Sequence, residues 1–269
     1  MEDFRRTPGT LGKYRHERTG TGMKWIEESP AGMMAAMLVL GPVLLAQGTY
    51  VRRTALKLPE PEGPRDGVSG TGTPLSLLII GDSAGAGVGA PSHDEALLGQ
   101  IRTALNNSFC LRWRLAAKTG FTTRDAIRRL EEMPAETFDT AVISLGTNDV
   151  TSSRMVSTWL GHLDHLAALL RSKFHARQIV FSGVGRMDEF PAFPQPLAWY
   201  MGARARQFNR ALQGWTSAQQ DCDMIPMDKK IEPEMMAEDG FHPGPSIYAL
   251  WGASVAEKIC RRWIGQARV

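Results

Sequence analysis

The chain has 269 residues, of which 43% are hydrophobic and 22% charged, a balance typical of a globular protein with a sizeable core. The formal net charge is only +3, and much of the basic excess lies before residue 66, so the remainder shows no basic patch that would favour nucleic acid as a partner. Three cysteines without CxxC spacing argue against a disulfide framework or a zinc site and fit a reducing compartment.

The N-terminal part combines a polar segment with an apolar one. Residues 1–28 are mostly polar and basic, and we expect them to be disordered, with translation starting at Met1 or at Met23. Residues 29–51 carry no charge, and a helix over them would be roughly 30 Å long, the thickness of a bilayer core. We therefore expect a helix that spans or lies on a membrane; a signal peptide or a helix packed on the catalytic domain are the alternatives.

Positive charges follow the apolar segment at Arg52, Arg53 and Lys57. If Met23 is the start, this distribution places the catalytic domain in the cytoplasm. With the longer chain both flanks are basic, and a secreted or periplasmic domain stays open. Residues 52–74 are rich in proline and glycine and are expected to form a linker.

From residue 75 to the end, patterns of buried strands alternate with amphipathic helix patterns. Strands are predicted at 75–80, 111–117, 139–145, 178–183 and 222–227, and helices at 95–107, 122–133, 153–174, 203–217 and 246–264. This alternation is typical of an α/β fold with a parallel sheet covered by helices on both faces. The sequence therefore predicts one catalytic domain over residues 75–269, built on a doubly wound parallel sheet of five strands.

Chemically useful motifs follow the predicted strands. They are Gly81-Asp82-Ser83, Gly120, Gly146-Thr147-Asn148-Asp149 and, before the last helix, Asp239-Gly240-Phe241-His242-Pro243. Taken singly, each is explained equally well as a turn or a helix cap. Because the carboxyl ends of parallel strands meet at one edge of a sheet, we expect all four motifs to lie together. A serine, a histidine and an aspartate in one place are the groups that nucleophilic acyl transfer requires.

In this order the four motifs resemble those of the SGNH hydrolases, the GDSL esterase/lipase family. The resemblance implies a flavodoxin-like three-layer α/β/α sandwich and a serine ester hydrolase that needs no cofactor or metal. It implies Ser83, Asp239 and His242 as the catalytic triad, with Asp82, Gly146 and Asp149 in supporting positions. It also implies an oxyanion hole formed by the backbone N–H groups of Ser83 and Gly120 and the side-chain amide of Asn148. Ala84 stands where the GDSL form of the family has leucine.

The substrate is expected to be a small or lipid-derived carboxylic ester, with a thioester, a lysophospholipid or an O-acetylated carbohydrate as alternatives on the same site. Residues 186–200 are rich in proline and aromatic side chains. Phe190, Phe193, Trp199 and Tyr200 are predicted either to line an acyl pocket or form a lid, or to pack as an ordinary surface loop. Nothing in the sequence indicates an oligomeric state.

Three other functions compete with this prediction. The run Gly85-Ala86-Gly87-Val88-Gly89-Ala90 matches a dinucleotide-binding fingerprint, but Ser83 already occupies the turn and Lys118-Thr119-Gly120 stands where a ribose-binding acid is expected. His162 and His165 have the spacing of a metal pair, but no third ligand is evident. A membrane-tethered scaffold without activity is disfavoured because every catalytic position is filled.

Overall fold

The structure is a computed structural model that describes residues 30–152 and 154–264. The segment predicted to be disordered, residues 1–28, lies outside the described residues. The chain divides into two compact units, residues 1–41 and 42–269, and the division falls inside the first of the helices that the structure describes. The second unit contains the sheet and every motif singled out above.

Helix α2 covers Pro30–Thr54 and corresponds to the predicted apolar helix. Its stretch from Ala31 to Thr54 contains an 18-residue window with a mean hydropathy of 1.7, and the stretch is long and apolar enough to cross a membrane, by length and composition only. The same length and composition also suit a signal sequence. Membrane association, and the side of the membrane on which the catalytic domain lies, therefore stay predictions.

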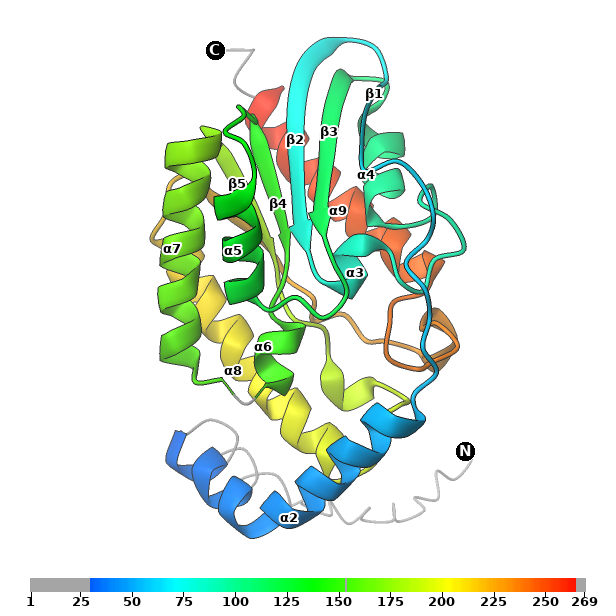
Figure 1. Cartoon of the computed structure of the whole chain (residues 1–269), viewed down its shortest axis with the longest axis vertical. Helices are drawn as coiled ribbons and strands as arrows, with labels where there is room; N and C mark the ends of the chain where they lie inside the picture. The colour runs from blue at the N-terminus through cyan, green and yellow to red at the C-terminus, as the bar shows by residue number, and fades with distance from the viewer. Residues whose placement is uncertain (1–29, 153, 265–269) are drawn as a thin grey trace, which may run out of the picture. The chain divides into compact units, whose positions relative to one another are not determined.

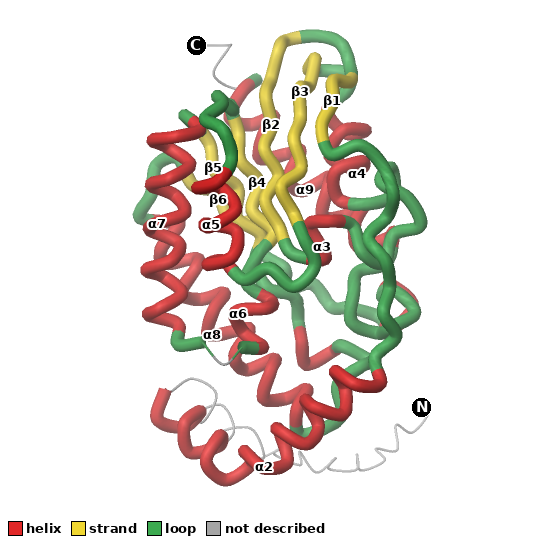
Figure 2. The backbone as a smooth tube through the Cα atoms, in the orientation of Figure 1, coloured by secondary structure: helices red, strands yellow, loops and turns green. Residues whose placement is uncertain are grey.

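A six-stranded sheet with strand order β1-β3-β2-β4-β5-β6 forms the centre of the second unit (Figure 2). Its strands are β1 (Asp66–Ser69), β2 (Thr73–Gly81), β3 (Phe109–Ala117), β4 (Thr140–Ser144), β5 (Gln178–Ser182) and β6 (Cys222–Ile225). Strand β1 pairs with β3 in the antiparallel sense, and the other neighbours are all parallel. The five parallel strands follow the order of flavodoxin-like folds.

Helices cover both faces of the sheet and make a three-layer sandwich (Figure 1). On one face lie α5 (Thr123–Glu132), α7 (Val156–Phe174) and α8 (Leu197–Ser217); on the other lie α4 (Leu97–Leu105) and α9 (Pro245–Trp263). The central strand β2 serves both layers, because successive side chains of a strand point to opposite faces. Leu78 and Ile80 belong to the α5–α7–α8 core, whereas Leu77 and Ile79 belong to the α4–α9 core.

The prediction of an α/β/α sandwich is confirmed, but the predicted count of five strands is wrong. The additional strand is β1, which falls within the predicted linker, and β2 also starts inside that range, at Thr73. The four residues of β1, DGVS, carry no alternating apolar pattern. Pairing with the edge of β3 makes this segment a strand, and a tertiary contact of that kind leaves no local signal.

Short elements at the carboxyl ends of the strands carry the predicted motifs. Helix α3 (Ser83–Ala86) follows β2, and α6 (Thr147–Thr151) follows β4. Two 3₁₀ turns, Met187–Glu189 and Pro233–Met235, lie in the loops after β5 and β6. Helix α8 starts at Leu197, earlier than the predicted residue 203. The sequence did not reveal this earlier start, because residues 197 to 202 carry no helix start signal beyond Pro196.

We expect Ile80→Ala to lower the free energy of unfolding by about 2–5 kcal/mol, because it removes fully buried methyl and methylene groups from the strand that carries the Ser83 turn. Val68→Ala on the edge strand β1, where the side chain is 68% exposed, should change it by less than about 0.5 kcal/mol. Urea unfolding followed by circular dichroism measures both values. Equal effects of the two substitutions would contradict the placement of Ile80 in the core.

Candidate active site

Ser83 lies on the sharp turn between β2 and α3. Strand β2 ends at Gly81, and Asp82 caps the short helix by accepting a hydrogen bond from the Ala84 N–H at 3.1 Å. Ser83 is the first residue of that helix, so its own N–H has no acceptor within the helix. Ser83 is 8% exposed. The hydroxyl is thereby held at the carboxyl edge of the sheet with little contact with bulk water.

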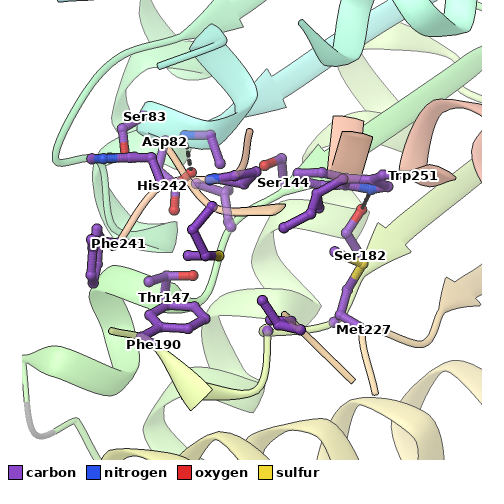
Figure 3. A pocket seen from close by; sticks show the side chains of 18 residues that line it. Asp82, Ser83, Ser144, Thr147, Ser182, Phe190, Met227, Phe241, His242 and Trp251 are labelled. Atoms are coloured by element: carbon purple, nitrogen blue, oxygen red, sulfur yellow. Dashed lines mark hydrogen bonds between the residues drawn. The ribbon is translucent and has the colours of Figure 1, made fainter. Parts of the chain in front are cut away.

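Asp239 and His242 lie on one compact loop that precedes α9. One oxygen of Asp239, Oδ1, accepts hydrogen bonds from the N–H groups of Phe241 and His242, each at 2.9 Å. The other oxygen, Oδ2, lies 2.5 Å from His242 Nδ1, and His242 Nε2 lies 2.9 Å from Ser83 Oγ. Residues predicted from separate motifs therefore form a continuous Asp–His–Ser chain of contacts (Figure 3 shows Ser83 and His242).

The glycines after Ser83 make room for protein atoms. A Cβ at Gly85 would lie 3.2 Å from the Ser144 side chain, and one at Gly89 would lie 2.4 Å from the Pro243 carbonyl oxygen. Gly89 has a φ of +94°, in the left-handed region that favours glycine. These glycines let the His242 loop and strand β4 approach the serine turn. That packing explains the glycine spacing without a nucleotide and disfavours the dinucleotide-binding alternative.

The three predicted oxyanion donors follow adjacent strands. Gly81 of β2 pairs with Ala117 of β3 and with Ser144 of β4, so the residues that follow them emerge side by side. Gly120 has a φ of +85°, and a Cβ there would meet no atom within 4 Å, so its surroundings are open. Asn148 Nδ2 donates to the Phe121 carbonyl oxygen at 2.9 Å. One N–H of that amide is thus engaged by the loop, which sets the direction of the other.

Asp149 and Gly146, predicted as supporting residues, hold the neighbouring loops. The fully buried Asp149 accepts hydrogen bonds from the N–H and the hydroxyl of Thr123 at 2.9 and 2.8 Å, which ties α6 to the start of α5. Burial raises the pKa of Asp149, and the bonds from Thr123 act against that rise. Gly146 has a φ of +124°, and a Cβ there would lie 2.9 Å from Val184 Cγ2. Only glycine suits this turn before Asn148.

The two carboxyl groups nearest Ser83 have opposite electrostatic character. Burial raises the pKa of Asp82 to about 7, although the backbone N–H groups of Ala84 and Gly85 favour its charged form. Burial also acts to raise the pKa of Asp239, but the His242 side chain and the two N–H donors of the loop outweigh it and lower that pKa below its usual range. Asp239 is therefore the permanent anion beside the imidazole.

A cavity lies beside Ser83 and His242 (Figure 3). Its wall includes Phe190, Phe241 and Thr147 near the histidine and Met227, Ser182 and Trp251 at the far end. Sequence reasoning missed Met227 and Trp251, because they come from the loop after β6 and from the first half of α9, where no motif marks them. Ile247 of α9 completes the apolar wall and is likewise unmarked in the sequence.

Of the four aromatic residues predicted for an acyl pocket, the structure places only Phe190 in the wall of this cavity. Phe193 packs behind it, with ring centroids 5.9 Å from Phe190 and 5.7 Å from Phe241. Trp199 and Tyr200 belong to helix α8, and Tyr200 is buried in its packing. The prediction treated residues 186–200 as one loop, whereas their last part is helical.

The metal alternative gains no support from the described part of the chain. His162 and His165 lie on α7, and His165 Nε2 is 3.4 Å from a Glu131 carboxylate oxygen. Within residues 30–152 and 154–264, no group of three or more His, Cys, Asp or Glu side chains is arranged to hold a metal ion.

The chain matches the GDSL-like lipase/acylhydrolase family over residues 79–250, more than half of its length. The chain therefore belongs to this family, as the four motifs predict. No curated protein matches the chain.

Solved structures of similar fold support the architecture. A lipolytic G-D-S-L family protein from Veillonella parvula is 16% identical, with a TM-score of 0.54 over 69% of this chain and 98% of that one. A carbohydrate acetylesterase from Sinorhizobium meliloti is 15% identical (TM-score 0.54; 70% and 100% covered). A psychrotrophic esterase from Pseudoalteromonas sp. is 18% identical (TM-score 0.51; 71% and 98% covered). At such identities the likeness concerns the fold, whereas the family match shows a hydrolase of the lipase and acylhydrolase class.

Asp82 should make the stability of the protein depend on pH. Because burial raises its pKa from 3.8 to about 7, the folded chain binds a proton in this interval that the unfolded chain has lost. The contribution of Asp82 to the free energy of unfolding therefore falls as the pH rises from about 4 to about 7, and it is constant above a pH of about 7. Asp82→Asn should make that fall smaller, as measured by urea unfolding at pH 5 and pH 8. An unchanged pH dependence in the variant would contradict the raised pKa.

Proposed function

We propose that this protein is a serine ester hydrolase that cleaves carboxylic esters through an acyl-enzyme on Ser83. The observation that carries the proposal is the chain of contacts from Asp239 through His242 to Ser83 Oγ, at 2.5 and 2.9 Å. A serine hydroxyl is a weak nucleophile until a base within hydrogen-bond distance takes its proton, and His242 Nε2 stands at that distance. Asp239, held anionic, would orient the imidazole and stabilise its charged form.

The reaction then follows in two halves. Ser83 Oγ attacks the ester carbonyl carbon while its proton moves to His242 Nε2, and the carbonyl oxygen becomes an oxyanion. Collapse of this tetrahedral intermediate breaks the bond to the alcohol oxygen, which takes the proton from His242 and leaves. Water, deprotonated by the same imidazole, attacks the acyl-enzyme, and Ser83 is regenerated as the carboxylic acid departs.

The oxyanion would accept hydrogen bonds from the N–H groups of Ser83 and Gly120 and from the side-chain amide of Asn148. Within residues 30–152 and 154–264, neither of these two backbone N–H groups donates to another acceptor. Donors that are fixed before the charge develops stabilise the transition state without having to reorganise, and one such donor is typically worth about 10²–10³ in turnover.

The cavity beside Ser83 favours a short acyl group. Its volume is about 70 Å³. A cavity needs about 10–15 Å³ to hold one water molecule, so only a few non-hydrogen atoms fit here. A second apolar cavity of about 120 Å³ lies behind it and shares Met227, Ile247 and Trp251 with its wall. Esters of acetic to butyric acid are therefore our preferred substrates. The small cavity equally suits an O-acetylated carbohydrate, which is the second candidate and the substrate class named for the Sinorhizobium meliloti neighbour.

Ser83→Ala should abolish labelling by a fluorophosphonate probe and lower kcat on p-nitrophenyl acetate by about 10⁴–10⁶-fold, because it removes the nucleophile. Ser217→Ala, which removes an exposed hydroxyl from α8, should label and turn over like the unsubstituted protein. Gel fluorescence and ester hydrolysis are the two measurements. Probe labelling that persists in the Ser83→Ala protein would reject Ser83 as the nucleophile.

Met227→Ala should shift the chain-length preference towards longer esters, because Met227 lines both cavities and a smaller side chain there widens the space between them. For p-nitrophenyl esters of two to sixteen carbons, the kcat/KM of the unsubstituted protein should be highest at two to four. In the variant, each additional methylene of the ester's acyl chain that becomes buried should contribute about 0.8 kcal/mol. Two such methylenes should therefore raise kcat/KM for the longer ester, relative to that for the acetate ester, by about tenfold. Met235→Ala, which widens only the second cavity, is the control. An unchanged profile in Met227→Ala would show that the acyl group binds elsewhere.

A further inference from the structure

Residues 57–65, which precede the sheet, pack against β3 and against the turn that follows β2; we call this segment the strap. It contains three prolines and no helix or strand, and several contacts hold it. The Leu115 N–H donates to the Arg65 carbonyl oxygen at 2.7 Å. Pro61 packs over Gly87 of the serine turn, where a Cβ would lie 3.0 Å from the proline Cγ. Gly63 lies against the buried ring of His93, where a Cβ would lie 2.7 Å from Nδ1. The strap lies outside residues 79–250, which match the family.

Glu60 of the strap binds the loop that carries Gly120. Its Oε1 accepts hydrogen bonds from both the N–H and the hydroxyl of Thr119, each at 2.7 Å. Its Oε2 forms an ion pair with Arg65, and Arg65 Nη1 donates to the Ala117 carbonyl oxygen at 2.6 Å. Burial acts to raise the pKa of Glu60, but the bonds from Thr119 and Arg65 lower it below its usual range, so the carboxylate stays charged.

The loop that Glu60 holds is a β-turn from Lys118 to Phe121, closed by the Phe121 N–H donating to the Lys118 carbonyl oxygen at 3.1 Å. Gly120 is the third residue of this turn, and its φ of +85° is that of a type II turn. In a type I turn the peptide between the second and third residues faces the opposite way. The direction of the Gly120 N–H therefore depends on how Thr119, the second residue, is held.

The loop is held from two sides. Asn148 donates to the Phe121 carbonyl oxygen at one end of the turn, and Glu60 accepts from Thr119 in its middle. Two hydrogen bonds on one residue, from its main chain and from its side chain, restrain both its backbone and its side-chain torsion. Glu60 itself is far in sequence from Ser83, and no motif of the sequence includes it.

We propose that Glu60 is a positioning residue of the oxyanion hole, which holds the turn at Thr119 so that the Gly120 N–H points at the developing oxyanion. This inference rests on the proposed ester hydrolysis at Ser83. Misdirecting a donor reduces stabilisation of the transition state much more than binding of the ester, because negative charge develops on the carbonyl oxygen only as the tetrahedral intermediate forms. Loss of Glu60 therefore lowers kcat and leaves KM nearly unchanged.

The test compares three substitutions in the full chain with p-nitrophenyl acetate as substrate. Glu60→Ala should lower kcat by about 10–100-fold, less than the about 10²–10³-fold expected when a donor is deleted, as in Asn148→Ala, with KM within about twofold of the unsubstituted value. Glu60→Gln keeps an oxygen that accepts from both Thr119 groups and loses only an exposed ion pair, so its kcat should recover to within about threefold. Glu62→Ala, on the same strap, removes an exposed carboxylate to which the described residues donate no hydrogen bond, and should match the unsubstituted protein.

A transition-state analogue separates positioning from general destabilisation. Affinity for a trifluoromethyl ketone, which forms a tetrahedral adduct at Ser83, should fall in Glu60→Ala by the same factor as kcat/KM. A kcat for Glu60→Ala equal to that of Glu62→Ala, or a loss confined to KM, would overturn the role of Glu60 while leaving the esterase intact. Absence of hydrolysis and of Ser83-dependent probe labelling in the unsubstituted protein would instead reject the proposed function, and the inference with it.

Discussion

The contact between Ser83 and His242 is the interaction on which the arrangement of this domain depends. The two residues are 159 positions apart, and their side chains meet at 2.9 Å only because the loop before α9 packs directly on the turn after β2. Gly89 makes that approach possible, since any side chain there would collide with the Pro243 carbonyl. Tyr248, fully buried at the start of α9, donates to the Val88 carbonyl oxygen at 2.6 Å and holds the two segments together. Without this packing each half of the site would be an ordinary turn.

Three buried carboxyl groups surround the site, and the balance between burial and hydrogen bonding sets the direction in which the pKa of each is shifted. Asp239 receives two N–H donors and the imidazole, which together overcome the cost of burial and lower its pKa. Burial prevails at Asp82 and Asp149, whose pKa values are raised. Of the three, Asp239 is the group whose surroundings favour the charged form, and it is the one in contact with His242. The other two carboxyl groups hold helix starts: Asp82 caps α3 under the serine, and Asp149 anchors the first residue of α5.

The turn that carries Gly120 shows how a segment outside the family region can bear on a family site. Asn148, within the matched region, binds one end of the turn, and Glu60, before it, binds the middle. The sequence offers no sign of the second contact. Residues 52–74 have the composition of a flexible linker, yet Arg65 joins the edge of β3 and β1 follows directly. Edge pairing and the packing of prolines against glycines order a segment that composition alone assigns to a linker.

The sequence by itself determined the alternation of strands and helices, the family, and the motif residues that the fold then gathers at one sheet edge. Those features are local: a buried strand, a glycine turn or an Asp-Gly-Phe-His loop is written in a few consecutive residues. The tertiary structure alone decided the sixth strand, the cavity wall formed with Met227 and Trp251, and the contact of Glu60 with Thr119. It also assigned the glycines after Ser83 to neighbouring protein atoms instead of to a ligand. Each of these depends on which distant segments touch, and packing between distant segments leaves no periodic or local pattern in the chain.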